Sequence, residues 1–284
     1  MRDNEIMLFD LSNIAYRSLY AMKMMTTTGK PNSHIFAFTN ILKGIRSRHG
    51  MSRFVFVLDS KPTRKLNMYP EYKATRESAE YNPTSDIHRF VRLINCRVVW
   101  CDGEEADDVI ASFCASNIGD SINIVSSDSD LYQLIDRRNG VRQLNPATNM
   151  FIGSDDLDKK FRLSRFDRVS LWKSLFGDSG DNIKPPVARL FKKDLIHIIE
   201  ACDGTVDGFM ECLRNSDVPD RTMRKINMCE NFVDTLKRNY SLISLVKSID
   251  YSEKEYSGNM LWLCQLLKSF ECYSLIGHEL RGLM

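Results

Sequence analysis

Residues 124–135, "IVSSDSDLYQLI", place two aspartates directly after an apolar run. The run begins near Ser121 and is typical of a strand buried in a parallel sheet. Asp128 and Asp130 then follow the strand, before an apolar helical pattern resumes. Serine and aspartate are common in turns and helix caps, whereas paired carboxylates without a basic neighbour also suit a metal ion. The segment by itself is consistent with either interpretation.

Acidic residues also follow three other predicted strands. Residues 5–10 end at Asp10, residues 53–59 end at Asp59, and residues 96–100 lead into the acidic run "EEADD" at 104–108. Ligands of open parallel α/β sheets bind beyond the carboxyl ends of the strands. The repeated arrangement therefore predicts one acidic site at that edge of the sheet.

The order of the elements predicts an α/β fold with a mostly parallel sheet flanked by helices. Strand patterns alternate with helical patterns until "NPATN" at 145–149, after which apolar residues recur at helical spacing. We therefore expect an α/β domain over residues 1–160 and a helical C-terminal domain over residues 161–284. Residues 60–86 are polar and are expected to form a flexible basic segment.

The composition argues against a disulfide-bonded protein and against a membrane-spanning one. Lys and Arg number 39 against 37 Asp and Glu, a balance of +2, so any nucleic-acid surface must arise from local segregation of charge. The eight cysteines include no C-x-x-C pair, which is typical of reduced thiols. No apolar stretch is long enough to span a bilayer. We expect a cytoplasmic monomer without a membrane partner.

The candidate ligands are all carboxylate oxygens. A cluster of like charges at this density needs cations to remain ionised. The five histidines form no H-E-x-x-H or other paired spacing, which disfavours zinc. The ligand set therefore favours Mg²⁺ or Mn²⁺.

Together with "GDSGDN" at 177–182, these motifs resemble those of the phage and bacterial 5′→3′ exonucleases and flap endonucleases. These are structure-specific nucleases with a PIN-like domain, and they include phage RNase H. "FDLSN", "LDSKPTRK", "EEADD" and "SSDSD" precede "GDSGDN" in that order, over about residues 5–200. The resemblance implies a PIN-like fold and a site for two Mg²⁺ ions, with Mn²⁺ as an alternative. It implies these metal-site residues: Asp10, Asp59, Glu105, Asp107, Asp108, Asp128, Asp130, Asp178 and Asp181.

The same resemblance assigns a role to the basic segment. "YPEYKATR" at 69–76 is similar to the base of a helical arch that passes a 5′ single strand. Lys73 and Arg76 would then face the scissile phosphate and, with Asp10 and Asp59, would be catalytic. A solvent-exposed loop would have a similar composition. The expected nucleic-acid contacts are Lys61, Arg64, Lys65, Tyr72, Lys73, Arg76, Arg189, Lys192 and Lys193.

One motif departs from the family pattern. Cellular relatives continue "GDxxDN" into a glycine-rich helix-turn-helix-like unit that holds a monovalent cation, whereas Pro185 and Pro186 stand at that place here. Proline removes backbone donors and cannot adopt positive φ. We expect an atypical helix-turn-helix-like DNA-binding unit, and the departure argues against a potassium site.

The expected function is that of a Mg²⁺-dependent structure-specific 5′ nuclease in phage DNA replication. Its substrates would be DNA with a 5′ flap or 5′ end and an RNA primer on DNA, and a single-strand-binding protein or polymerase is a candidate partner. One alternative is a haloacid-dehalogenase-like phosphatase, but Ser12 replaces the acid/base aspartate that such enzymes need two residues after the first. A catalytically silent nucleic-acid-binding module is the other alternative, and it would not need the carboxylates.

Overall fold

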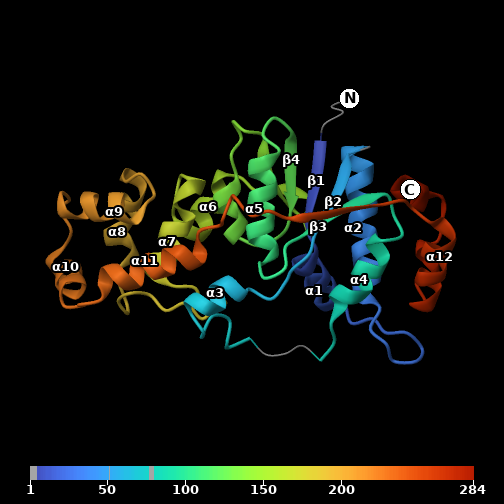
Figure 1. Ribbon diagram of the computed structural model, residues 1–284, viewed down its shortest axis with the longest axis horizontal. Coiled ribbons are helices and arrows are strands. Elements are labelled where there is room, and N and C mark those ends of the chain that lie inside the picture. Colours follow the sequence, from blue (N-terminus) through green and yellow to red (C-terminus); the bar gives the residue numbers. More distant parts are fainter. Residues whose placement is uncertain (1–4, 51, 77–79) are drawn as a thin grey trace.

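A computed structural model describes residues 5–50, 52–76 and 80–284 (Figure 1). Its centre is a seven-stranded sheet of order β6-β5-β4-β1-β2-β3-β7. The inner five strands are parallel, and β6 and β7 pair antiparallel at the two edges. The strands are β1 (Glu5–Asp10), β2 (Arg53–Val57), β3 (Cys96–Trp100), β4 (Ser121–Val125), β5 (Val141–Asn145), β6 (Met150–Phe151) and β7 (Ser252–Tyr256).

Both faces of the sheet are covered by helices. Successive side chains of a strand point to opposite faces, so Met7 and Phe9 of β1 enter one core while Ile6 and Leu8 enter the other. The first face is covered by α1 (Leu11–Ala21), α2 (Ser33–His49), α4 (Pro83–Val91) and α12 (Met260–Ser269). The second face is covered by α5 (Ala106–Ser116). Continuous apolar runs such as "IMLF" are the result of this two-sided burial.

A helical lobe lies beside the sheet, at the end of the molecule opposite α12 (Figure 1). Its own core is separate from those of the sheet and includes Trp172 and Phe209. The lobe contains α6 (Ser154–Phe161), α7 (Val169–Phe176), α8 (Lys192–Ala201), α9 (Val206–Arg214), α10 (Asp220–Asn227) and α11 (Phe232–Ile243). Short 3₁₀ helices are η1 (Asp130–Leu134), η2 (Phe166–Arg168), η3 (Tyr273–Leu275) and η4 (His278–Leu283).

The C-terminal region differs from the all-helical expectation for residues 161–284. Residues Ser252–Tyr256 form β7, which pairs with β3, and Leu263 and Leu267 of α12 pack in the core of the sheet. β7 has the sequence "SEKEY", whose charged side chains are typical of an exposed edge strand and carry no apolar strand pattern. The sequence reading also missed β5 and β6. Residues 252–284 therefore return to the α/β part of the molecule.

The basic segment is also more ordered than expected. Residues 63–68 form α3 (Thr63–Met68), and Lys65 and Tyr72 are buried. The backbone N–H of Lys73 donates to the Asp181 carbonyl at 3.0 Å, which ties the segment to the helical lobe. Residues 77–79, at the centre of the predicted arch, lie outside the described residues. The part of 60–76 that was predicted to be flexible instead bridges the sheet and the lobe.

Within these described ranges, none of the helices combines the length and the apolar composition that crossing a bilayer requires.

Candidate active site

The strand ends meet in a hollow of about 590 Å³ at the carboxyl edge of the sheet. Asp10 is the last residue of β1, Asp59 follows β2 by two residues, and Asp128 follows β4 by three. The carboxylates that line the hollow are Asp10, Asp59, Glu105, Asp107 and Asp128. We call Asp10, Asp59, Asp107 and Asp128 the sheet-edge cluster. The structure thus brings together residues from four sequence motifs, as the parallel topology predicts.

Hydrogen bonds hold the sheet-edge carboxylates in position. Asp10 caps α1 by accepting a hydrogen bond from the Asn13 N–H at 3.1 Å, and it also accepts from the Ser126 hydroxyl at 2.9 Å. Asp59 accepts from the Ala106 N–H at 2.8 Å, which fixes it against the start of α5. The carboxylates are therefore held by neutral donors that do not cancel their charge.

The electrostatics of this cluster are those of crowded like charges, of which Asp10 is buried, Asp107 and Asp128 are partly exposed and Asp59 is exposed. Burial and the neighbouring charges of Asp59 and Asp128 raise the pKa of Asp10 to about 7. Burial, Asp128 and Asp10 raise the pKa of Asp107 well above its ordinary value. Within the described parts of the chain, Lys and Arg form no ion pair with any member of the cluster. The cluster is therefore short of positive charge, and its oxygen donors fit a divalent ion.

Glu105 has the opposite environment. Its carboxylate accepts hydrogen bonds from Lys65 Nζ and from the Tyr72 hydroxyl, both at 2.8 Å, and from Lys73 Nζ. Burial raises the pKa of Glu105, but the two lysines outweigh burial and lower the pKa to about 2. Glu105 thus lines the hollow as an ionised carboxylate that holds Lys73 there.

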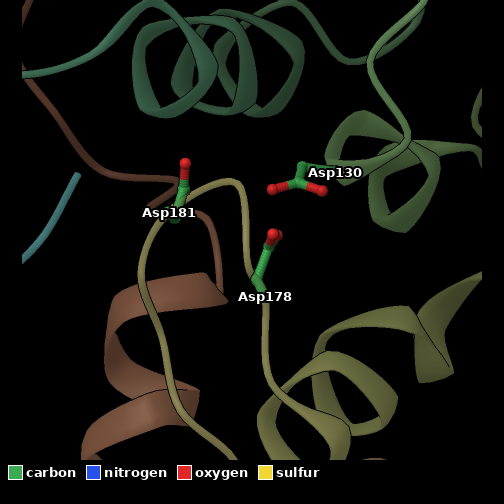
Figure 2. A group of neighbouring side chains, drawn as sticks. All are labelled: Asp130, Asp178 and Asp181. Carbon is green, nitrogen blue, oxygen red and sulfur yellow. The ribbon is translucent and has the colours of Figure 1, made fainter. Parts of the chain in front are cut away.

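A second group of carboxylates lies at the border with the helical lobe. Asp130 follows β4, whereas Asp178 and Asp181 belong to the turn after α7, and Figure 2 shows the three side chains near one another. One oxygen from each lies within 4.8 Å of the others. We call Asp130, Asp178 and Asp181 the lobe cluster. These three residues were all predicted from sequence.

The turn that carries Asp178 and Asp181 is closed by its backbone. Asp178 and Ile183 exchange two hydrogen bonds of 2.8 Å. Gly177 has φ +80°, and a Cβ on it would lie 2.7 Å from the Ile183 carbonyl oxygen. A side chain at residue 177 is therefore excluded both by conformation and by space.

Lys173 was missed by the sequence analysis. It lies in α7, only 9% exposed, and its Nζ contacts Asp178 at 2.6 Å and also Asp130. Its charge outweighs burial, so that the pKa of Asp178 is lowered. The available signal was weak: a single lysine in the apolar stretch "VSLWKSLF", five residues before Asp178. Arg17 was also missed, although it lines the hollow two helical turns after Asp10.

Asp108, which was also expected at the metal site, lies outside both clusters in this structure. It is fully buried, accepts from the Val246 N–H at 2.9 Å, and pairs with Arg64 at 3.0 Å and Lys65 at 2.9 Å. Asp107 and Asp108 are adjacent on a helix and cannot face the same direction. Asp108 therefore anchors α3 to α5.

Three expected nucleic-acid contacts are also engaged inside the protein. Lys65 and Tyr72 are each 3% exposed, and the Tyr72 hydroxyl bridges Glu105 and Asp181. Arg64 is held by Glu104 as well as Asp108. Nucleic-acid contact by Lys65 and Tyr72 stays a prediction, and in this structure both side chains are buried and hydrogen-bonded to carboxylates.

The remaining basic residues are more accessible. Lys73 and Arg76 line the hollow, and Arg76 pairs with Asp181 at 2.7 Å while remaining half exposed. Lys61 is exposed at the start of the segment. Arg189, Lys192 and Lys193 are exposed on the helical lobe, where Lys192 lies 4.3 Å from the Trp172 ring centroid. None of these three contributes to the acidic hollow.

Comparison with known proteins agrees with this arrangement. The family model described as the 5′-3′ exonuclease, N-terminal resolvase-like domain, matches residues 5–162. The 5′-3′ exonuclease of Buchnera aphidicola is 24% identical over 239 residues, which cover 80% of this chain and 81% of that one. DNA polymerase I of Pseudomonas aeruginosa is 29% identical over 214 residues. That match covers 73% of this chain but only 23% of the polymerase.

Solved structures share the fold. A 5′-exonuclease of bacteriophage T5 with bound zinc has a TM-score of 0.66 at 20% identity, covering 84% of this chain and 89% of that one. The catalytic core of Rad2 in complex with DNA substrate has a TM-score of 0.61 at 16% identity, covering 100% and 94% of the two chains. The predicted PIN-like α/β fold is confirmed. By its sequence motifs and the match over residues 5–162, this chain belongs to the 5′-3′ exonuclease family.

Proposed function

We propose that the protein is a metal-dependent, structure-specific 5′ nuclease that hydrolyses phosphodiesters at 5′ ends or flaps of DNA and at RNA primers. The observation that carries the proposal is the sheet-edge cluster, in which four carboxylates share one hollow with Lys73 and Arg76 and form no ion pair with Lys or Arg in the described part of the chain. The T5 enzyme and Rad2, which have been crystallised with metal ions and with DNA substrate respectively, support the assignment by their shared fold.

The proposed ions are Mg²⁺, with Mn²⁺ as an alternative, because the donors are carboxylate oxygens only. Asp10, Asp59, Asp107 and Asp128 would hold one ion, and the lobe cluster would hold the second. When bound, divalent ions at such a site supply the Lewis acidity that activates water and offsets charge on the departing oxygen.

The protein's own residues would then position and stabilise the phosphodiester. Glu105 fixes the Lys73 ammonium at the rim of the hollow, where a positive charge offsets the charge that develops on the transferring phosphate. Arg76, bound to Asp181, provides a second cation on the same rim. Asn13 and Ser126 keep the Asp10 carboxylate in the orientation that an ion would need.

The test is cleavage of a 5′-labelled DNA flap duplex and a matching RNA-primed duplex in Mg²⁺, in Ca²⁺ and in EDTA. Mg²⁺-dependent release of short 5′ products, absent in EDTA, is expected. A gel shift without cleavage of either substrate would contradict the proposal and would favour a nucleic-acid-binding module. The products also distinguish stepwise from endonucleolytic cleavage and DNA from RNA preference.

A variant with Asp10→Asn and Asp128→Asn connects the activity to the cluster. Loss of cleavage with retained DNA binding is expected, because the two amides bind a divalent ion poorly while repulsion of phosphate decreases. Asp120→Asn is the matched control, since Asp120 pairs with Arg53 away from the hollow. Turnover in Mg²⁺ that survives the double substitution would show that the sheet-edge cluster does not hold the metal.

A further inference from the structure

The two carboxylate clusters differ in how their charge is balanced. The sheet-edge cluster has neutral donors and no ion pair with Lys or Arg among the described residues. In the lobe cluster, Lys173 pairs with Asp130 and Asp178, and Arg76 pairs with Asp181. Every carboxylate of the lobe cluster therefore already contacts a cation supplied by the chain.

Lys173 is placed in the lobe cluster by packing. α7 contributes Leu171, Trp172 and Leu175 to the core of the helical lobe, and its residue 173 faces the carboxylates. The Lys173 side chain is 11% exposed, so its ammonium is held between Asp130 and Asp178 and is largely withdrawn from water. Figure 2 shows Asp130 and Asp178 facing one another from separate loops. The ammonium thus bridges these loops.

We propose that Lys173 is a built-in competitor of the divalent ion at the lobe cluster, so that the sheet-edge cluster fills first and the lobe cluster fills only when the ammonium is displaced. Lys173 would then be a positioning residue that sets the order of metal loading. The inference rests on the proposed function, since it concerns the second of its two ions.

Simple electrostatics supports this order. An ion entering the sheet-edge cluster meets carboxylates whose pKa is raised by burial and by like-charged neighbours. Lys73 and Arg76 line the same hollow, but among the described residues they pair with Glu105 and Asp181 and not with a member of this cluster. An ion entering the lobe cluster must approach a fixed ammonium at the distance of an ion pair, where repulsion in a partly buried site is strong. The same ammonium stabilises the lobe carboxylates without metal, because it cancels part of their mutual repulsion.

The experiment is a titration of the DNA-free protein with Mn²⁺, in which electron paramagnetic resonance measures the free ion. The wild-type protein is expected to show one tighter and one weaker class of site, and Asp178→Asn should remove the weaker class. Lys173→Met should tighten the weaker class by about tenfold or more and leave the tighter class unchanged. Lys159→Met, on the exposed face of α6, is the matched control.

Lys173→Gln, which keeps a hydrogen-bond donor without the charge, gives a second variant with the same expected change. Thermal unfolding distinguishes a metal-competing lysine from a merely structural one. Both variants should melt lower than wild type in EDTA and should gain more in Tm from Mn²⁺ than wild type gains.

Two results would overturn the inference, and they are distinguishable. Two classes of Mn²⁺ site whose affinities are unchanged in both Lys173 variants would refute the competition but leave the proposed function standing. A wild-type protein that binds no Mn²⁺ at millimolar concentration would refute the metal site itself, and the inference with it.

Discussion

The chain has two basic stretches that look alike in sequence but behave differently in the structure. Residues 61–76 contain five Lys or Arg, and residues 189–193 contain three. In the first stretch, Lys65 is buried and Arg64, Lys73 and Arg76 all pair with carboxylates. In the second stretch, Arg189, Lys192 and Lys193 are exposed and none has an ion pair among the described residues.

The difference lies in the neighbouring negative charge. A cation beside a dense carboxylate cluster is stabilised more by ion pairing than by solvation. The fold can bury such a cation only because a carboxylate partner is present. A cation far from the cluster remains solvated and is free to meet a phosphate. Proximity to carboxylates in space, which the sequence does not show directly, therefore separates basic residues that act as internal counter-charges from those that remain solvated.

The largest expected effect is loss of stability on removing a buried counter-charge. Lys65→Met should lower the free energy of unfolding by about 3 kcal/mol, because Glu105 and Asp108 would lose a shared ammonium in a buried position. Urea denaturation measures the change. Lys61→Met is the matched control and should remain within about 0.5 kcal/mol of wild type. Equal stability of the Lys65 variant and wild type would show that Lys65 is not a stabilising counter-charge, and the two basic stretches would then not differ in this respect.

The next effect concerns Lys73, which is paired but still faces the hollow. Lys73→Ala should lower single-turnover cleavage by about 10²-fold while changing substrate affinity only a few fold, because its charge matters most at the transition state. Rapid-quench kinetics and equilibrium binding on the same flap duplex measure the two quantities. Equal losses in rate and affinity would make Lys73 a binding contact of the same kind as the lobe residues.

The smallest effect is expected on the helical lobe. Lys193→Ala should weaken binding of a duplex by only a few fold. The slope of log affinity against log salt concentration should fall by about the amount of one phosphate contact, and the cleavage rate at saturating substrate should not change. Fluorescence anisotropy at several salt concentrations tests this. Lys159→Ala serves as the control on another exposed helix of the lobe. A fall in saturated cleavage rate without a fall in affinity would contradict the assignment.

Much of the fold and the acidic site could be predicted because the signals are local. Apolar runs followed by Asp10, Asp59 and Asp128 identify strand ends, and parallel topology then brings those ends together. The exposed strand β7 could not be predicted, because its sequence "SEKEY" lacks an apolar alternation and its pairing with β3 is set by tertiary contacts.

Whether a given acidic or basic residue faces the hollow depends on the direction of its side chain and on its distance from residues of other segments. "EADD" predicts acidic residues at the start of a helix, but only the helix orientation shows that Asp107 faces the hollow while Asp108 faces Lys65. Lys173 was hidden for the same reason, since its partners come from another loop and from five residues further along the chain. The order of motifs predicted the family, whereas the pairing of charges depends on tertiary contacts that the motifs do not encode.

The return of residues 252–284 to the sheet has a consequence for the order of folding. The helical lobe is inserted between two parts of one folding unit, so the core containing Phe9 and Phe38 is completed only when Leu263 and Leu267 are available. During synthesis, the first five strands would emerge long before the helix that seals one of their faces. Such long-range closure is expected to slow folding and to leave apolar surface open to chaperones until residues 260–269 have been synthesised.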